Sequence, residues 1–333
     1  MNKKIIVIII IAVFFLLGIV LGRYLYFQSQ IDKGQIQRIT VKNLDYKFID
    51  PLLAYDNTIE SNLPIYNSFK NKLQNLVNKL SPNTSTEKIG LFFKDFKNDF
   101  SYGINENSQF HPASLFKVPL MMSYLAALQN DPNLLNKTIL YKGGVDANQL
   151  ETTKPKQYIE PGDTYTISDI INYMIIYSDN NATNLLLSII DKQSFDAIFN
   201  NLGIQLPSSV SEKFINFVTP KQFALFFRIL RNSTYLDLDT SEKALEILSK
   251  SDYKNGLVAG VPSGITVSHK FGEYASEDSS GNKIYQLHDC GIIYGPHNYL
   301  LCIMTMGKDY DNLKNDIVSI SKFIYREIVN NYQ

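Results

Sequence analysis

Hydrophobic and polar positions alternate with regular periods along most of the chain, and these periods predict its helices and strands. From Leu63 onward apolar residues recur at helical spacing until Ser81-Pro82-Asn83 ends the helix. The apolar runs Ile89–Phe93 and Phe100–Ile104 then predict two strands. Further helices are predicted at Val118–Leu128, Ile167–Tyr177, Ala182–Ile190, Pro220–Leu230 and Leu313–Val329, and further strands at Thr266–Tyr274, Gln286–Tyr294 and Tyr299–Met306.

The order of strands, helices, strands and a closing helix is typical of an α+β architecture. We expect the two terminal parts of the chain to share an antiparallel sheet and the middle part to form an all-helical lobe. The cleft between the two parts is the natural place for a site. The pattern also divides the chain into a transmembrane anchor at residues 1–24, a polar stalk at 25–62 and one main domain at 63–333.

The N-terminus carries an apolar run that predicts a membrane anchor. The uncharged stretch from Ile5 to Gly22 would extend about 27 Å as a helix, close to the hydrocarbon thickness of a bilayer. Lys3 and Lys4 before it favour a cytoplasmic N-terminus and an extracytoplasmic domain on a single-pass anchor. A cleaved signal peptide is the alternative, although no small-x-small site follows the run. A lipoprotein anchor is excluded because no cysteine precedes Cys290.

The only two cysteines, Cys290 and Cys302, flank a turn-like segment at residues 295–298. If that turn joins two antiparallel strands, the two positions lie nearly opposite each other. An extracytoplasmic location permits a disulfide. Two buried free thiols are the alternative, because the register of the strands decides whether the sulfur atoms can meet.

Composition and charge narrow the class of protein. Hydrophobic residues make up 45% of the 333 residues and charged residues 19%, which is ordinary for a globular domain. The 32 basic and 32 acidic side chains cancel and are mixed along the chain. This balance gives no electrostatic footprint for nucleic acid. The four histidines, at 111, 269, 288 and 297, lack metal-ligand spacing, so we expect neither a metal nor another cofactor.

The first candidate for chemistry is a Ser-x-x-Lys pattern formed by Ser114 and Lys117. Ser114 is the only one of five such serines predicted to open a buried helix, where its backbone N–H could stabilise an oxyanion. Three residues make nearly one helical turn, so Lys117 lies on the same face and, if desolvated, could accept the hydroxyl proton. A helix cap with a surface lysine is the alternative interpretation.

Two further polar patterns are candidates for chemistry. Ser178-Asp179-Asn180 occurs once, between two apolar helices, and suits a proton relay and a hydrogen-bond partner for a substrate amide, or simply a helix cap. Lys270 and Gly272 lie in a predicted strand. A fixed cation there could bind a substrate carboxylate, and the glycine would allow a close backbone approach, although a lysine on an edge strand can also serve only to prevent aggregation.

In the order Ser-x-x-Lys, Ser-Asp-Asn and Lys-x-Gly, these patterns resemble those of the penicillin-recognising serine enzymes, and most closely the class A β-lactamases. The resemblance covers roughly residues 63–333. It implies the β-lactamase and transpeptidase-like fold. It is carried by Phe110–Pro119, Ser178–Leu186, Thr219-Pro220, Gly260-Val261-Pro262 and Val267–Lys270.

The resemblance also implies a role for each matching residue. Ser114 would be acylated, Lys117 would be its base, and Ser178 would relay a proton to the leaving nitrogen. Asn180 would bind a substrate amide and Lys270 a substrate carboxylate. Among the substrate-binding positions, the backbone N–H of Glu273, after Gly272, would be the second oxyanion donor, although a glutamate is unusual there.

Two departures from the family pattern matter for activity. Phe271 stands where the family has Thr or Ser, which removes a hydrogen bond to the substrate carboxylate worth about 1.5 to 3 kcal/mol. The Glu-x-x-Leu-Asn motif that activates the deacylating water is absent, and the segment at 206–213 is roughly a dozen residues too short. Asn184, which resembles the residue that braces that loop, is retained. Glu212 is a substitute carboxylate or a solvated surface residue.

These observations favour a serine hydrolase that forms an acyl-enzyme on Ser114 with β-lactams or related amides. The first alternative is a D-alanyl-D-alanine peptidase, transpeptidase or slowly deacylating penicillin-binding protein acting on peptidoglycan stem peptides, which the short loop favours. The second is a non-catalytic cell-wall-binding module, which the retained Lys117 argues against. The expected protein is a monomer in the cell membrane, bound through its N-terminal helix, with no nucleic-acid partner.

Overall fold

The computed structural model describes Leu21, Arg23 and residues 46–50, 64–82, 85–149, 151–206 and 216–331. Residues 44–51 and 58–333 belong to one compact unit. The predicted anchor and stalk lie almost wholly outside the described residues, so both stay predictions. Within the described part of the chain, no helix combines the length and the apolar character needed to cross a membrane.

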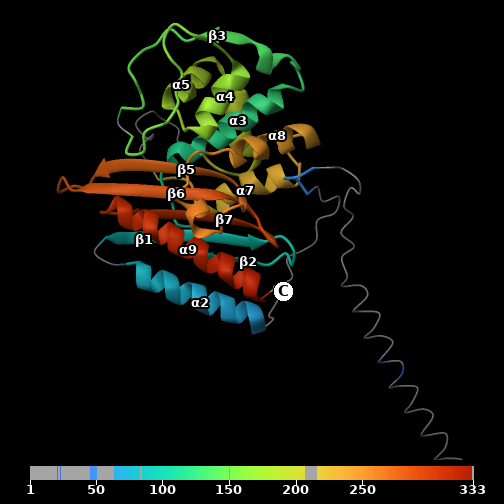
Figure 1. The fold of residues 1–333 in the computed structure, drawn as a ribbon, viewed down its shortest axis with the longest axis vertical. Coiled ribbons are helices and arrows are strands. Elements are labelled where there is room, and N and C mark those ends of the chain that lie inside the picture. Colours follow the sequence, from blue (N-terminus) through green and yellow to red (C-terminus); the bar gives the residue numbers. More distant parts are fainter. Residues whose placement is uncertain are drawn as a thin grey trace, which may run out of the picture. The chain divides into compact units, whose positions relative to one another are not determined.

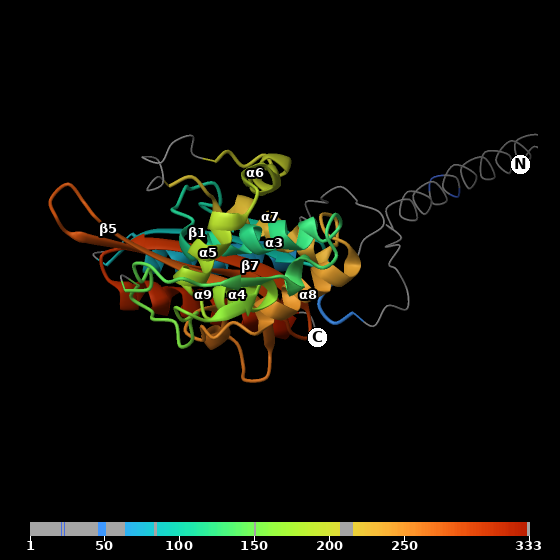
Figure 2. The same cartoon turned by 90° about the horizontal axis from the view of Figure 1, so that it is seen from above.

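A five-stranded antiparallel sheet forms the centre of the domain, with the strand order β2-β1-β7-β6-β5. The strands are β1 (Thr86–Asp95), β2 (Ser101–Ile104), β5 (Thr266–Glu277), β6 (Lys283–Tyr294) and β7 (Asn298–Gly307). Because β7 pairs with both β1 and β6, it joins the N-terminal and C-terminal strands into one sheet, as the sequence predicts. Figures 1 and 2 show the β5–β6 hairpin projecting beyond the other strands.

Two hydrophobic cores lie on the two faces of the sheet. Helices α2 (Pro64–Leu80) and α9 (Tyr310–Asn331) cover one face, where Phe93, Ile303 and Ile320 share a core (Figure 1). Phe92 and Leu300 face the other way and join the core of the helical lobe. Both faces of the central strands are therefore buried, which explains their continuous apolar runs.

The helical lobe lies on the second face of the sheet and contains the α-helices that the structure describes between β2 and β5 (Figure 1). The predicted helices correspond to α3 (Lys117–Ala127), α4 (Ile167–Ile176), α5 (Asn180–Ile189) and α7 (Pro220–Arg231). Sequence analysis missed α6 (Lys192–Asn201), α8 (Leu238–Ser249) and the short antiparallel pair β3 (Thr138–Leu140) and β4 (Thr164–Thr166). The α+β architecture with its helical lobe is confirmed.

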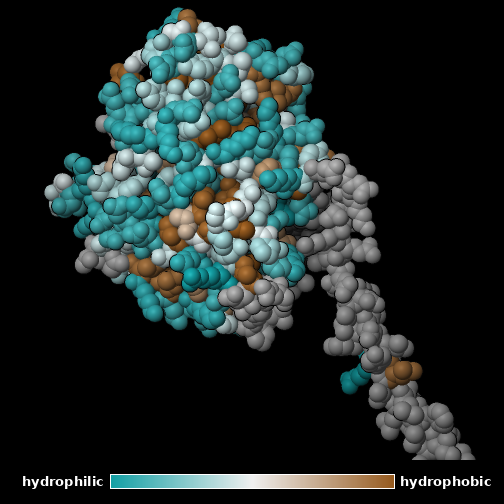
Figure 3. Space-filling model, viewed as in Figure 1, coloured by the Kyte–Doolittle hydropathy of each residue, from teal (hydrophilic) through white to brown (hydrophobic). Residues whose placement is uncertain are grey.

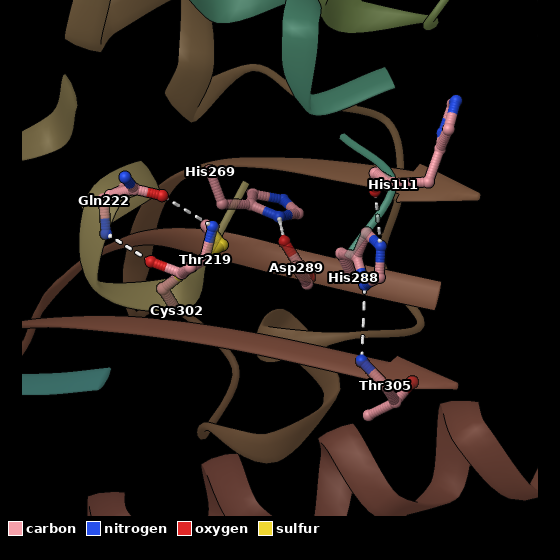
Figure 4. Close-up of a disulfide and its surroundings, with 9 residues drawn as sticks. His111, Thr219, Gln222, His269, His288, Asp289, Cys302 and Thr305 are labelled. Carbon is pink, nitrogen blue, oxygen red and sulfur yellow. Dashed lines mark hydrogen bonds and ion pairs between the residues drawn. A yellow bond between two sulfur atoms is a disulfide. The ribbon is translucent and has the colours of Figure 1, made fainter. Parts of the chain in front are cut away.

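The two cysteines form a disulfide in the centre of the sheet. Cys290 on β6 and Cys302 on β7 are direct partners in the strand register, and their sulfur atoms are 2.02 Å apart. Both residues are fully buried. Of the two alternatives that the sequence left open, the structure therefore has the disulfide (Figure 4).

The described surface agrees with the composition. The face in Figure 3 is mostly hydrophilic, with small scattered hydrophobic areas. The largest exposed fraction of a big hydrophobic side chain is 93%, at Val145 in the segment between β3 and β4.

Candidate active site

Ser114 lies in a single 3₁₀ turn, Ala113–Phe116, directly before α3. Ala113 has a φ of 49°, in the left-handed region that a residue with a Cβ adopts only at a cost. This backbone turn presents the half-buried Ser114 at the start of the helix, as predicted. Such strain concentrates at functional sites.

Gly272 explains how β5 comes so close to this turn. A Cβ atom at position 272 would lie 3.0 Å from the backbone nitrogen of Ser114 and 3.1 Å from the Cβ of Ala113. Only glycine therefore fits without a shift of the strand or the turn. The sequence suggested a close approach of a substrate at Gly272, whereas the structure shows a close approach of the turn that carries Ser114.

Lys117 is the first residue of α3 and its side chain is buried, with 2% exposed. Its Nζ donates hydrogen bonds to the carbonyl oxygen of Ser178 at 2.6 Å, to the Ser178 Oγ at 3.1 Å and to the Asn180 Oδ1 at 2.7 Å. Burial lowers the pKa of Lys117 to about 7, although the negative charges of Glu151 and Asp179 oppose the shift. A large fraction of these side chains is therefore neutral, and able to accept a proton, near neutral pH.

Lys270 reaches the same hydroxyl from the sheet. It is fully buried on β5, and its Nζ donates to the Ser178 Oγ at 2.9 Å and to the Phe271 carbonyl oxygen at 3.0 Å. Burial, and then the nearby charge of Lys117, lower the pKa of Lys270 well below its usual value.

Ser178 thus connects the two lysines, and its backbone has a φ of 61° between α4 and α5. A hydroxyl can accept hydrogen bonds from both amines and donate one in return, so it can pass a proton between them. Lys117 on α3 and Lys270 on β5 therefore meet at the Ser178 hydroxyl. Among the described contacts, neither lysine bonds to the Ser114 hydroxyl.

Asp179 is the residue that fixes this loop. It is the N-cap of α5, where its side chain accepts a hydrogen bond from the backbone of Asn181 at 2.9 Å. The same fully buried carboxylate accepts from the Asn148 side chain at 2.8 Å and from the backbone of Ile159 at 2.9 Å. Of the three residues 178–180, Asp179 is therefore the helix cap, and it also holds the irregular segment 141–163 against the lobe.

Two carboxylates at this segment were not predicted as a pair. The Glu151 Oε1 accepts a hydrogen bond from the Asn180 Nδ2 at 2.5 Å, and burial, then the charge of Glu273, raise the pKa of Glu151. Glu273, predicted only for its backbone N–H, accepts from the backbone of Thr153 at 2.7 Å and from the Tyr310 hydroxyl. No sequence signal marks Glu151, because it lies in a segment without periodicity.

Phe271 lies beside Lys270 in place of a hydroxyl. Its ring stacks on Tyr253 with centroids 3.9 Å apart, and the Lys270 Nζ lies 4.3 Å from its centroid. The same ring forms part of the wall of a cavity of about 200 Å³ that Tyr177 and Lys154 also line. The side of Lys270 at which the family places a hydroxyl is therefore aromatic.

The buried histidines have structural partners (Figure 4). The His269 Nδ1 bonds to Asp289 at 2.7 Å. The His288 Nδ1 accepts from the backbone of Thr305, so its Nε2 donates to the carbonyl oxygen of His111. Burial lowers the pKa of His288 to about 3, which keeps it neutral. The described residues contain no group of three or more His, Cys, Asp or Glu that could hold a metal ion.

The antiparallel sheet, the all-helical lobe and the cluster of Lys117, Ser178 and Lys270 beside Ser114 define the β-lactamase and transpeptidase-like class of fold. Residues 68–328 match the Beta-lactamase enzyme family, so the chain belongs to that family. A comparison with curated protein sequences finds no match.

Solved structures show the same fold at low identity. PBP-A is 20% identical, with a TM-score of 0.64 over 78% of this chain and 96% of that one. A β-lactamase from Sphaerobacter thermophilus is 20% identical, with a TM-score of 0.63 over 76% and 95%. The TLA-3 extended-spectrum β-lactamase is 19% identical, with a TM-score of 0.67 over 79% and 99%. At this identity the likeness establishes the fold alone.

Proposed function

We propose that the protein is a serine hydrolase that forms an acyl-enzyme on Ser114 with β-lactams or related amides. The observation that carries the proposal is the hydrogen-bonded cluster of Lys117, Ser178 and Lys270 beside the strained turn of Ser114. Buried lysines with lowered pKa values are costly to fold and are typical of sites that transfer protons.

We propose that acylation uses two proton transfers. The Ser114 Oγ attacks the carbonyl carbon while its proton passes to neutral Lys117. The C–N bond of the amide then breaks, and Ser178 hands a proton from the lysine pair to the leaving nitrogen. The backbone N–H groups of Ser114 and Glu273 would stabilise the oxyanion, a placement supported by the close contact between Gly272 and the Ser114 turn.

We further propose that deacylation is slow, so that the protein acts as a penicillin-binding peptidase or transpeptidase more readily than as an efficient β-lactamase. The sequence lacks the Glu-x-x-Leu-Asn motif, and Glu212, its only candidate substitute in the short loop, lies outside the described residues. The solved structure of a PBP-A mutant with penicillin G is described as an acyl-enzyme complex, and it is 21% identical to this chain.

The experiment is to mix the full-length protein with a chromogenic cephalosporin and to follow colour release and intact mass together. One equivalent of adduct on Ser114 with no further colour supports the slowly deacylating enzyme, whereas steady colour without a lasting adduct supports a β-lactamase. Ser114→Ala should abolish both signals. Ser280→Ala is the matched control, because Ser280 begins another Ser-x-x-Lys pattern in the exposed β5–β6 turn. No adduct and no colour with the unmodified protein would favour a non-catalytic wall-binding module.

We also propose that the domain is extracytoplasmic, tethered by the apolar run near the N-terminus. The Cys290–Cys302 disulfide supports this location, because such bonds persist in oxidising compartments. The test is digestion of intact cells with an added protease. Loss of the domain without cell lysis would support the location, and full protection of the domain would contradict it.

A further inference from the structure

Asn180 is the residue that the family resemblance assigns to a substrate amide, and its hydrogen bonds are already used. The Lys117 Nζ donates to its Oδ1 at 2.7 Å. The Nδ2 therefore points the other way. It donates to the Glu151 Oε1 at 2.5 Å and to the carbonyl oxygen of Ala147 at 3.3 Å.

These contacts use both hydrogens of the Asn180 amide. An amide NH₂ group has only two, so no third donor is left for a substrate carbonyl. To bind such a carbonyl, Asn180 would have to give up its bond to Glu151 or its longer bond to the Ala147 carbonyl oxygen. The recognition group that the protein offers here is the acceptor, the Glu151 carboxylate.

Glu273 is a second carboxylate beside Glu151, and its negative charge adds to burial in raising the pKa of Glu151. The charge of Lys117 opposes this shift, but the described hydrogen bonds of the Lys117 Nζ go to Ser178 and Asn180 and not to either carboxylate. A cation that bonds directly to Glu151 would offset the repulsion between the two carboxylates.

We propose that Glu151 makes the site selective for acyl donors that carry an ammonium group on the acyl side of the scissile bond. This ammonium donates to Glu151 beside Asn180 and offsets the repulsion between Glu151 and Glu273. This inference rests on the proposed acylation of Ser114. The family resemblance implies that Asn180 donates a hydrogen bond to a substrate carbonyl. In our proposal, Glu151 instead accepts a hydrogen bond from a substrate cation.

The test compares two penicillins that differ by one group. Ampicillin carries an ammonium on the side-chain carbon where benzylpenicillin carries hydrogen, and N-acetylampicillin keeps the nitrogen on that carbon as a larger, uncharged amide. At pH 7 most of the ampicillin amine is in its protonated, ammonium form. The second-order rate constant for the mass adduct on Ser114 is measured for all three with the full-length protein. We expect ampicillin to react at least about threefold faster than the other two, because a partly desolvated ion pair is gained.

Variants then assign the preference to one carboxylate. Glu151→Gln should bring the three rate constants together, and Glu151→Asp should keep part of the ampicillin preference. Glu160→Gln is the matched control, since Glu160 is an exposed carboxylate in the same segment. It should leave all three rates unchanged.

The outcomes separate the two proposals. Equal rates for the three penicillins with the unmodified protein would overturn the selectivity and leave the acylation of Ser114 established. A preference that survives in Glu151→Gln would also overturn the role of Glu151. If none of the penicillins labels Ser114, the proposed function itself is wrong, and the inference about Glu151 falls with it.

Discussion

The lysine cluster and the carboxylate side of the site are built in different ways. Lys117, Ser178 and Lys270 lie on or directly beside regular elements, namely the start of α3, the α4–α5 junction and β5. Glu151 lies in the irregular segment 141–163, which crosses to β5 through the hydrogen bond from Thr153 to Glu273. The residues that we propose for proton transfer match the family pattern, whereas Glu151, which we propose for recognition, is not part of it.

Proton transfer and substrate recognition can therefore change separately. Proton transfer needs fixed distances, which helices and strands with buried neighbours provide. The group that we propose for recognition lies instead in the irregular segment 141–163, which is held by hydrogen bonds from Asn148 and Ile159 to Asp179 and from Thr153 to Glu273. A family member can therefore keep its chemistry and take another substrate.

Replacing Lys117, the proposed base, should have the largest effect on acylation. Lys117→Met should lower the rate of acylation by about 10²- to 10⁴-fold, because the Ser114 proton loses its acceptor. The measurement is the rate of adduct formation with a penicillin, by intact mass. Lys283→Met is a matched control, since Lys283 completes the Ser280 pattern and is exposed. An unchanged rate in Lys117→Met would assign the base to Lys270 or to another group.

Replacing Asp179 should detach the irregular segment 141–163 from the lobe. Asp179→Ala leaves three buried donors, on Asn148, Ile159 and Asn181, without their acceptor. We expect the free energy of unfolding to fall by at least about 3 kcal/mol, measured by denaturant titration. Asp163→Ala, at an exposed carboxylate in the same segment, should change it by less than about 0.5 kcal/mol. Equal losses in the two variants would show that Asp179 does not anchor the segment.

Regular structure accounts for what the sequence could predict. Strands β6 and β7 are buried on both faces, so their apolar runs mark them clearly. The turn between them predicts only that Cys290 and Cys302 lie nearly opposite each other, and the structure supplies the exact register. Helices α6 and α8 were missed because each shows only a short apolar stripe. Their N-caps, Asp191 and Asp237, are the signals that could have found them.

The site was predictable only where a motif marks it. Ser114, Lys117, Ser178, Asn180 and Lys270 come together in space, but their roles remain predictions. The use of both Asn180 hydrogens depends on how segment 141–163 crosses the lobe. That crossing is fixed by contacts 20 to 120 residues apart in sequence, such as those of Ile159 with Asp179 and of Thr153 with Glu273. No local pattern encodes such contacts.

The pH dependence of acylation tests whether Lys117 is the base. Burial lowers the pKa of Lys117 to about 7, so the neutral amine that accepts the Ser114 proton becomes more abundant as pH rises. Acylation should increase roughly tenfold per pH unit below pH 7 and level off above it. The measurement is the rate of adduct formation by benzylpenicillin between about pH 5 and pH 9. Glu160→Gln should give the same profile, and a rate independent of pH would exclude Lys117 as the base.

The smallest expected effect concerns the aromatic side of Lys270. Phe271→Thr restores the hydroxyl that the family uses for a substrate carboxylate and removes the ring that lies 4.3 Å from the Lys270 Nζ. It also loses the stacking on Tyr253 and enlarges the neighbouring cavity of about 200 Å³, which offsets part of the gain. We therefore expect acylation by benzylpenicillin to rise by only about threefold, measured by intact mass.

Phe271→Val separates the hydroxyl from the loss of the ring, because valine matches threonine in shape and cannot donate a hydrogen bond. If Phe271→Thr reacts faster than both Phe271→Val and the unmodified protein, the site still binds carboxylates through Lys270, and the aromatic ring limits that binding. If Phe271→Thr and Phe271→Val react alike, Lys270 serves the Ser178 relay alone, and the acyl donor is recognised at the Glu151 side of the cleft.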